Sequence, residues 1–243
     1  MRRKLLPYYD ERACKVDMIV LHAVAYAPQQ AIQTFVDHGV SSHYVIGQDG
    51  ELWQLVGEKH RAWHAGKSFW RGADDLNSHA IGIELCSPSL GQRPFTTAQK
   101  ETLKALLKRL IQKYHIKPEN IVGHSDIAPS RKPDPGKAFF WKELATQGIC
   151  LWYNLNDASK MKENKPEKLL EIIGYDTMDL QAALFSFCRH FVPEVIPTVK
   201  NISHLIENPV DRSLDLSKNE KVLKILKAVS YKYLNASKTP CKI

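Results

Sequence analysis

Residues 120–136 read NIVGHSDIAPSRKPDPG, a short apolar run that leads directly into a segment rich in proline and glycine. The run has the composition of a strand end, and the segment after it is typical of a loop. This loop carries His124, Asp126, Lys132 and Asp134, which are more reactive groups than an ordinary connection needs. The stretch is therefore either a polar linker or one wall of an active site at the end of a strand.

Two other apolar runs predict buried strands earlier in the chain. The run VDMIVLHAV at 16–24 carries His22 near its C-terminal end, and HAIGIELCS at 79–87 carries Glu84. Between them, residues 41–56 alternate apolar and polar positions around a turn that contains glycine, which predicts a hairpin.

Helical patterns alternate with these strands. Pro28 opens a short amphipathic segment that Gly39 closes, and residues 96–115 carry leucines at helical spacing behind a Thr96/Gln99 capping box. We expect a long loop between the hairpin and the 79–87 strand. Alternating strands and helices predict an α/β fold, a mixed sheet flanked by helices.

The composition changes after residue 153, where a polar, lysine-rich stretch begins. Beyond it, helical patterns occupy 167–173, 179–191 and 217–235, the last behind a Ser217…Glu220 capping box. We therefore predict a small all-α domain at the C-terminus. The predicted division is 1–153 for the catalytic domain, 154–166 for a linker and 167–243 for the helical domain.

The bulk composition is that of a globular protein. The chain has 243 residues, 44% of them hydrophobic and 25% charged, with a formal net charge of +8. The charge suits an anionic partner, but it is spread along the chain, so we expect no nucleic-acid binding. No apolar run is long enough for a transmembrane segment. The five cysteines form no CxxC pair and predict neither a disulfide framework nor a zinc finger.

Three of the reactive residues form a set that metals bind. His22 and His124 each end a predicted strand, and Asp134 follows ten positions after His124. Two imidazoles, one carboxylate and an open fourth position are the ligands of a catalytic zinc site. The prolines around Asp134 restrict the backbone of its loop, so the carboxylate can be held at low entropic cost.

Five segments in collinear order, within about residues 16–150, carry a resemblance to a known family: VLHAV, VSSHYVIGQDGELWQLV, AWHAGKSFWRG, LNSHAIGIEL and GHSDIAPSRKPDPG. Together they resemble the zinc-dependent N-acetylmuramoyl-L-alanine amidases of the AmiD/AmpD type. These are related to phage lysozyme-type amidases and to peptidoglycan recognition proteins. In the tail, IGYD and AALFSFCRHFVPE look like the helical peptidoglycan-binding module of AmiD-type enzymes.

The resemblance implies a role for each reactive residue. His22, His124 and Asp134 match the zinc ligands, Glu84 the catalytic glutamate and Lys132 the catalytic lysine. Zinc would acidify its water and polarise the scissile carbonyl. Glu84 would carry the proton to the departing L-alanine nitrogen, and Lys132 would stabilise the oxyanion.

Other polar residues have weaker assignments. By resemblance, His64 and Asn77 line the substrate groove. Asp126 either bonds the backbone at the start of its loop or orients a ligand, and His43 is either a support for the site or a core residue. Phage-type relatives carry a catalytic tyrosine immediately before the histidine equivalent to His43; here that position is Ser42, which places more of the catalysis on Glu84.

The tryptophans allow two interpretations. Trp53, Trp63 and Trp70 form either a sugar-stacking surface or ordinary core packing, and core packing is the default for such side chains.

The predicted activity is hydrolysis of the amide between N-acetylmuramic acid and L-alanine in peptidoglycan or muropeptides, for cell-wall remodelling or recycling. We expect a monomer with zinc as its cofactor. The rival interpretation is a peptidoglycan-binding protein that does not cut. A wall-binding tail favours the periplasm or outer membrane if an export signal was removed. The N-terminus as given lacks the apolar stretch of a signal peptide, which favours the cytoplasm.

Overall fold

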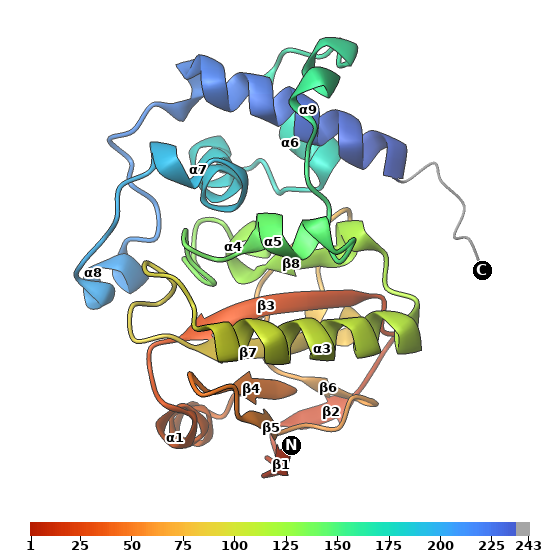
Figure 1. Cartoon of the computed structure of the whole chain (residues 1–243), viewed down its shortest axis with the longest axis vertical. Helices are drawn as coiled ribbons and strands as arrows, with labels where there is room; N and C mark the ends of the chain where they lie inside the picture. The colour runs from red at the N-terminus through yellow and green to blue at the C-terminus, as the bar shows by residue number, and fades with distance from the viewer. Residues whose placement is uncertain (237–243) are drawn as a thin grey trace.

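The computed structural model describes residues 1–236 and shows a mixed sheet with helices on both faces and beyond one edge (Figure 1). The strand order of the main sheet is β1-β5-β4-β7-β3-β8, and β2 pairs with β6 in a separate ribbon. The strands are β1 (Arg2–Arg3), β2 (Tyr9–Glu11), β3 (Met18–Val24), β4 (Tyr44–Ile46), β5 (Leu52–Gln54), β6 (His60–Ala62), β7 (Ala80–Cys86) and β8 (Ile121–Gly123).

The helices alternate with the strands up to β8 and then follow one another to the end of the described chain. The α-helices are α1 (Pro28–His38), α2 (Leu76–His79), α3 (Thr97–Tyr114), α4 (His124–Ile127), α5 (Trp141–Thr146), α6 (Pro166–Ile173), α7 (Leu180–Phe191), α8 (Ile202–Glu207) and α9 (Glu220–Ala236). Short 3-10 turns are η1 (Pro118–Asn120), η2 (Leu155–Lys160), η3 (Pro193–Val195) and η4 (Leu216–Lys218). Among the described helices, none is long and apolar enough to cross a membrane.

The central strands β4, β7, β3 and β8 run parallel, while β5 pairs antiparallel with β4 as the predicted hairpin requires. In β3 and β7, His22 lies directly beside Glu84 in the register. Because side chains alternate between faces along a strand, these two residues share one face of the sheet. The α/β fold predicted from the sequence is confirmed.

The opposite face of the sheet is covered by α3. Leu103, Leu107 and Leu110 on α3 are fully buried and join Leu21 and Ile83 from the sheet in one apolar cluster. The capping box at the start of α3 forms as predicted, with the Gln99 amide N–H donating to the Thr96 side chain. This layer leaves the face that bears His22 and Glu84 free of α3.

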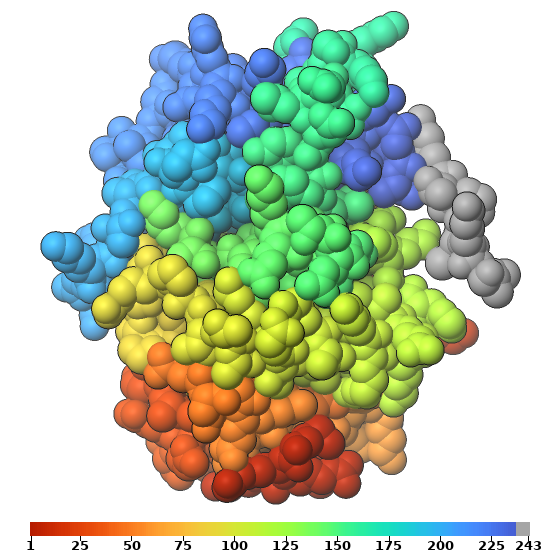
Figure 2. Space-filling view, viewed as in Figure 1, coloured from red at the N-terminus to blue at the C-terminus, as the bar shows by residue number. Residues whose placement is uncertain are grey.

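The C-terminal helices pack beyond the β8 edge, above α4 and α5 (Figure 1). One apolar cluster contains Val20 and Val122 of the sheet together with Leu170, Phe187 and Val229 of the helices. On the face shown in Figure 2 the helices lie in direct contact with the segment that contains α5. The core is thus continuous from the sheet to α9, and the division into domains at residue 153 stays a prediction.

Some expectations for the connections were wrong. The segment predicted as a long loop contains β6 and α2, because β6 pairs with the N-terminal strand β2, which local periodicity did not reveal. The loop after β8 begins with one helical turn, α4. The stretch 154–166 contains η2, which buries Ala158 and packs on α9, and its assignment as a linker stays a prediction.

The N-terminal cap of the last helix, α9, also differs from the prediction. Asn219, not Ser217, accepts the amide N–H of Val222 at the start of α9, and the Ser217 hydroxyl donates to Asp215 instead. An asparagine directly before the helix competes well for the cap, so the spacing of Ser217 and Glu220 was misleading. Short helices α5 and α8 were not predicted, since six residues carry too little periodicity.

The cysteines of the described chain are free, as the lack of paired spacing indicates. Cys86, Cys150 and Cys188 are buried, and burial raises the pKa of each thiol to about 12. Cys14 is free and half-buried, and Cys241 lies outside the described residues.

Candidate metal centre and active site

His22, His124 and Asp134 come together at the carboxyl ends of β3 and β8, and all three are buried. The Nδ1 atoms of the two histidines are 2.9 Å apart, and Asp134 Oδ2 lies 3.1 Å from Nδ1 of His124 and 3.4 Å from Nδ1 of His22. Ligand atoms about 2.0–2.1 Å from a tetrahedral zinc lie roughly 3.3 Å from one another. The spacing of this cluster therefore fits zinc.

The outer nitrogen of each histidine fixes which nitrogen carries the proton. His124 Nε2 lies 3.2 Å from the Ala65 carbonyl oxygen, which only accepts, so His124 donates there and Nδ1 is left with a lone pair. His22 Nε2 lies 3.1 Å from His64 Nδ1, and donation from His22 to His64 leaves Nδ1 of His22 in the same state. Two lone pairs and a carboxylate oxygen thus converge without a proton donor between them. A bound cation would accept these lone pairs and balance the negative charge of the carboxylate.

The charge states agree with that arrangement. Burial, reinforced by His124, lowers the pKa of His22 to about 4, so its imidazole is neutral at pH 7. Burial alone would raise the pKa of Asp134, but His124 and His22 hold it well below its usual range. With His22 neutral and Asp134 ionised, the cluster offers imidazole nitrogens and one negative charge, a donor set suited to zinc.

Glu84 lies at the edge of the cluster. Its Oε1 is 3.9 Å from Nδ1 of His22, across the β3–β7 pairing, and the residue is only 8% exposed. Burial and the charge of Asp134 raise the pKa of Glu84 to about 8, while Lys132 acts in the opposite direction. The strand register, and not the chain sequence, brings this carboxyl to the cluster.

The loop after α4 is closed on itself by backbone bonds. The amide N–H of Ser125 donates to the Asp134 carbonyl over 2.7 Å, and the amide N–H of Lys132 donates to the Ala128 carbonyl over 3.0 Å. The Lys132 side chain is half-buried, makes no ion pair with the described part of the chain, and lowers the pKa of both His22 and Glu84. Its ammonium is thus near the cluster and uncommitted.

His64 and Asn77, predicted to bind substrate, form a buried support beside the cluster. Asn77 Oδ1 accepts the amide N–H groups of His64 and Ala65, at 2.9 and 2.8 Å. The His64 ring packs over Gly82 of β7, where a Cβ atom would lie 2.5 Å from Cγ of His64. Contact of these two residues with substrate stays a prediction. His64 contacts His22 directly, and Asn77 acts one step further away, through the backbone of His64 and Ala65.

His43 lies one step further from the cluster. Its ring packs edge-on against His64, and its Nδ1 accepts the amide N–H of Gly82 at 3.0 Å. Both interpretations of this residue hold in part, because it is a fully buried core residue that also contacts His64. The neighbouring Ser42 is fully buried too, and its hydroxyl has no partner within the described residues.

Asp126 takes the first of the two roles considered for it. Its Oδ2 accepts the amide N–H of Gly123 at 2.8 Å, at the start of the loop. The same carboxylate binds the C-terminal helices, since Tyr175 donates to Oδ1 at 2.7 Å and His190 Nδ1 lies 2.8 Å from Oδ2. No hydrogen bond joins Asp126 to His22 or Asp134 in residues 1–236.

Two arginines that the sequence analysis missed hold the surrounding loops. Arg12 reaches the carbonyl groups of Glu58, Ser78 and Ala80, and lies 2.8 Å from Nε2 of His43. Arg131 donates to the Ala65 carbonyl, the same oxygen that His124 binds. Neither residue stands in a periodic pattern. Only the motif position of Arg131, beside Lys132, gave a signal.

The tryptophans differ in their surroundings. Trp70 is 2% exposed and packs on Tyr175 and Tyr233, which is core packing. Trp53 is half-buried under Arg2, and Trp63 is half-buried near Tyr8. Sugar stacking by Trp53 or Trp63 stays a prediction.

The fold and the cluster define a class first: an α/β protein with a buried His-His-Asp metal-binding arrangement at the carboxyl ends of parallel strands. Residues 12–137 match the family model described as N-acetylmuramoyl-L-alanine amidase. The chain belongs to the N-acetylmuramoyl-L-alanine amidase family, and the enzyme class predicted from the sequence is confirmed.

Known proteins resemble the chain beyond the family segment. It is 45% identical over 209 residues to N-acetylmuramoyl-L-alanine amidase AmiD of Escherichia coli, an alignment covering 74% of this chain and 76% of the relative. The solved complex of E. coli AmiD with anhydro-N-acetylmuramic acid-L-Ala-D-gamma-Glu-L-Lys has a TM-score of 0.73 and 32% identity over 93% of both chains. AmpDH3 of Pseudomonas aeruginosa has a TM-score of 0.72 and 30% identity, over 95% of this chain and 96% of that one.

Proposed function

We propose that this protein hydrolyses the amide between the lactyl group of N-acetylmuramic acid and the L-alanine of the stem peptide, in peptidoglycan or in muropeptides. Family membership supports the reaction class. The solved E. coli relative was studied with an anhydromuropeptide substrate, which supports the substrate class. Cell-wall remodelling or recycling is the use that such a reaction serves.

One observation carries the proposal: the convergence of His22, His124 and Asp134, whose ligand atoms lie 2.9–3.4 Å apart with no proton donor between them. We propose that the set holds zinc. When bound, zinc would polarise the scissile carbonyl and acidify a water molecule. The fourth position of a tetrahedral site stays open to the substrate, because the three residues supply only three ligand atoms.

The protein's own groups would carry the proton and hold the developing charge. Glu84 faces the cluster from β7, and a bound dication would favour its ionised form over the protonated form that burial favours. As a carboxylate it would accept the proton of the attacking water and deliver it to the departing alanine nitrogen. Lys132, whose ammonium is uncommitted, donates to the oxyanion of the tetrahedral intermediate. His64 and Asn77 position His22 through the contacts described above and line the groove for the substrate.

The test is digestion of purified muropeptides by the full chain, analysed by mass spectrometry. The expected products are the free stem peptide and the sugar with its lactyl acid. Metal analysis of the purified protein should find zinc at about one per chain, and removal by a strong chelator should stop the reaction. Cleavage of a glycosidic bond, or no cleavage by protein that holds its metal, would contradict the proposal.

The rival function is a peptidoglycan-binding protein without activity, and the digestion separates the two. The C-terminal region 167–243 is proposed to bind wall polymer, as the resemblance of IGYD and AALFSFCRHFVPE implies. Sedimentation with insoluble peptidoglycan checks this point. Binding without release of soluble peptide would favour the rival over the amidase.

We propose action in the periplasm or at the outer membrane, with the cytoplasm as the alternative. The proposed binding of wall polymer by the C-terminal region favours the first location. Fractionation of cells that express the gene from its own start would decide between them. We propose a monomer, which light scattering of the purified chain checks.

A further inference from the structure

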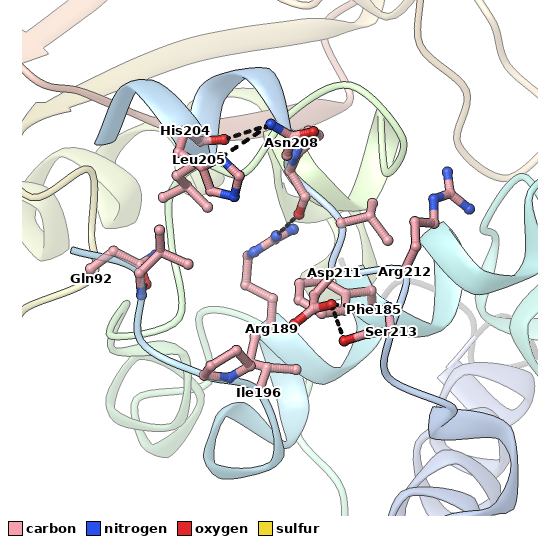
Figure 3. Close-up of a pocket in the computed structure, with 14 residues that line it drawn as sticks. Gln92, Phe185, Arg189, Ile196, His204, Leu205, Asn208, Asp211, Arg212 and Ser213 are labelled. Carbon is pink, nitrogen blue, oxygen red and sulfur yellow. Dashed lines mark hydrogen bonds between the residues drawn. The ribbon is translucent and has the colours of Figure 1, made fainter. Parts of the chain in front are cut away.

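A cavity of about 410 Å³ lies in the C-terminal region, between α7, the segment after η3, α8 and residues 208–213 (Figure 3). Its volume is that of a small-molecule site. Much of its wall is apolar, with Phe185, Ile196, Leu205 and Val210 among the buried contributors. No residue of the metal cluster lines it.

Arg189 of α7 is the buried charged residue among those that line this cavity. It is 2% exposed, and its side chain extends toward the segment that holds Asn208 (Figure 3). One terminal nitrogen donates to the Pro209 carbonyl, while the other, Nη1, has no acceptor within residues 1–236. Burial lowers the pKa of Arg189 to about 10, with Asp126 acting to raise it, so the guanidinium remains charged at neutral pH.

No carboxylate of the described chain is paired with this charge. Asp211, which also lines the cavity, is occupied by the amide and hydroxyl groups of Ser213. Arg212, the other arginine of the cavity, is paired with Asp179. Arg189 is therefore a buried cation that forms no ion pair with the residues described.

Asp126 and Asp134 attract the Arg189 guanidinium from a distance, and its Cζ lies 5.1 Å from the centre of the Phe185 ring, but burial still dominates its pKa. A buried cation without an ion-pair partner is unfavourable, and replacing it with an apolar residue commonly stabilises a fold. A bound anionic ligand would supply the missing negative charge and offset the cost of burying Arg189. A single guanidinium surrounded by apolar wall suits a singly charged carboxylate on an apolar body better than a phosphate, which needs more donors to replace its hydration.

We propose that the cavity binds a carboxylate carried on a small apolar body, with the carboxylate on Arg189. The site is separate from the proposed amidase reaction, and it does not depend on the metal. The carboxylate has two candidate sources, the end of a peptide and a fatty acid, which share this chemistry.

Thermal unfolding of the full chain tests the proposal with three probes: N-acetyl-alanyl-alanine, hexanoate and inorganic phosphate. We expect the melting temperature to rise with at least one of the two carboxylates and not with phosphate. The carboxylate that acts assigns the source. No rise with either carboxylate, or a rise with phosphate alone, overturns the proposal.

Three variants test whether the rise in melting temperature comes from binding at Arg189. Arg189→Met should abolish the rise, and without ligand it should melt at the same temperature as the native chain or above it. Arg212→Met, at the same cavity but exposed, should keep the rise. Val210→Trp fills the cavity while keeping Arg189, and should also abolish the rise, which keeps the test valid should Arg189→Met not fold. A rise that persists in Arg189→Met or Val210→Trp overturns the proposal.

Discussion

The carboxylate of Asp126 lies 2.8 Å from Nδ1 of His190, and both side chains are buried, at 1% and 4% exposure. Asp126 stands two residues after His124 in α4, whereas His190 stands near the end of α7. Tyr175 and the amide of Gly123 bind the same carboxylate. Asp126 therefore bonds the turn that carries one metal ligand to the C-terminal region, and the hydroxyl of Ser186 on α7, which donates to the Ser125 carbonyl at 2.6 Å, is a second bond between them.

Asp126→Ala should lower both stability and metal affinity. It leaves the donors of Gly123, Tyr175 and His190 buried without an acceptor, which costs on the order of 3 kcal/mol or more of unfolding free energy. Because α4 then keeps only the Ser186–Ser125 hydrogen bond to α7, we expect zinc affinity to fall about 10–100-fold. Urea unfolding and competition with a chromophoric chelator measure the two effects. Asp37→Ala, an exposed control on α1, should change neither.

Glu84→Ala should abolish turnover while zinc content stays unchanged. The carboxyl lies 3.9 Å from His22 and is not one of the three clustered ligands, so its role is to move the proton. Muropeptide release and metal analysis on the same preparation check this. Full activity in the variant would remove the assigned role, and loss of zinc would make Glu84 a ligand.

Lys132→Met should lower kcat about 10²–10³-fold, the usual effect of losing one oxyanion contact. Its ammonium has no ion-pair partner in residues 1–236, so stability and zinc content should not change. Lys67→Met, an exposed lysine of the neighbouring loop, serves as the control. An equal loss in both variants would point to general attraction of an anionic substrate instead.

Gly82→Ala should disturb the metal centre indirectly, by displacing the ring of His64. The new Cβ would lie 2.5 Å from Cγ of His64, and displacing that ring removes the acceptor of His22 Nε2. Since an outer partner orients its ligand, we expect zinc affinity to fall about 10–100-fold. Gly57→Ala is the matched control, because its nearest contact, with His60, is at 3.4 Å. Unchanged affinity in Gly82→Ala would show that His64 does not hold His22.

The free energy of unfolding should decrease in acid because Glu58 becomes protonated. This residue lies far from the loop of Asp134 in the sequence. Burial acts to raise its pKa, but hydrogen bonds from Arg109, Lys113 and Tyr44 lower it from 4.5 to about 2. The contribution is complete above pH 4.5 and is lost as the pH falls toward 2. It is on the order of 3 kcal/mol.

Glu58→Gln should therefore be less stable at pH 7 and should lose less stability between pH 5 and 2 than the native chain. Urea unfolding at several pH values measures this difference. Glu101→Gln, which removes an exposed carboxylate paired with Lys104, should follow the native profile. A parallel decline for Glu58→Gln and the native chain would contradict the assignment.

The sequence by itself determined the elements whose signals are local. The apolar runs of β3 and β7, the Thr96 cap of α3 and the hairpin turn follow from periodicity and turn chemistry over a few residues. The candidate ligands His22, His124 and Asp134 followed as well, because each stands in a short motif whose order along the chain is specific. Short helices and the β2–β6 pairing were missed, since their stability comes from distant partners.

Only the tertiary structure decided what surrounds those residues. The β3–β7 register, not their distance along the chain, puts Glu84 beside His22. Arg12 reaches the loop carbonyls from the N-terminus, and Asp126 reaches His190 across 64 positions. Side chains that bind distant backbone or one another leave no periodic trace, because the contact depends on where whole elements pack. Short motifs revealed the residues that carry the chemistry, whereas only the packing revealed the side chains that hold those residues in place.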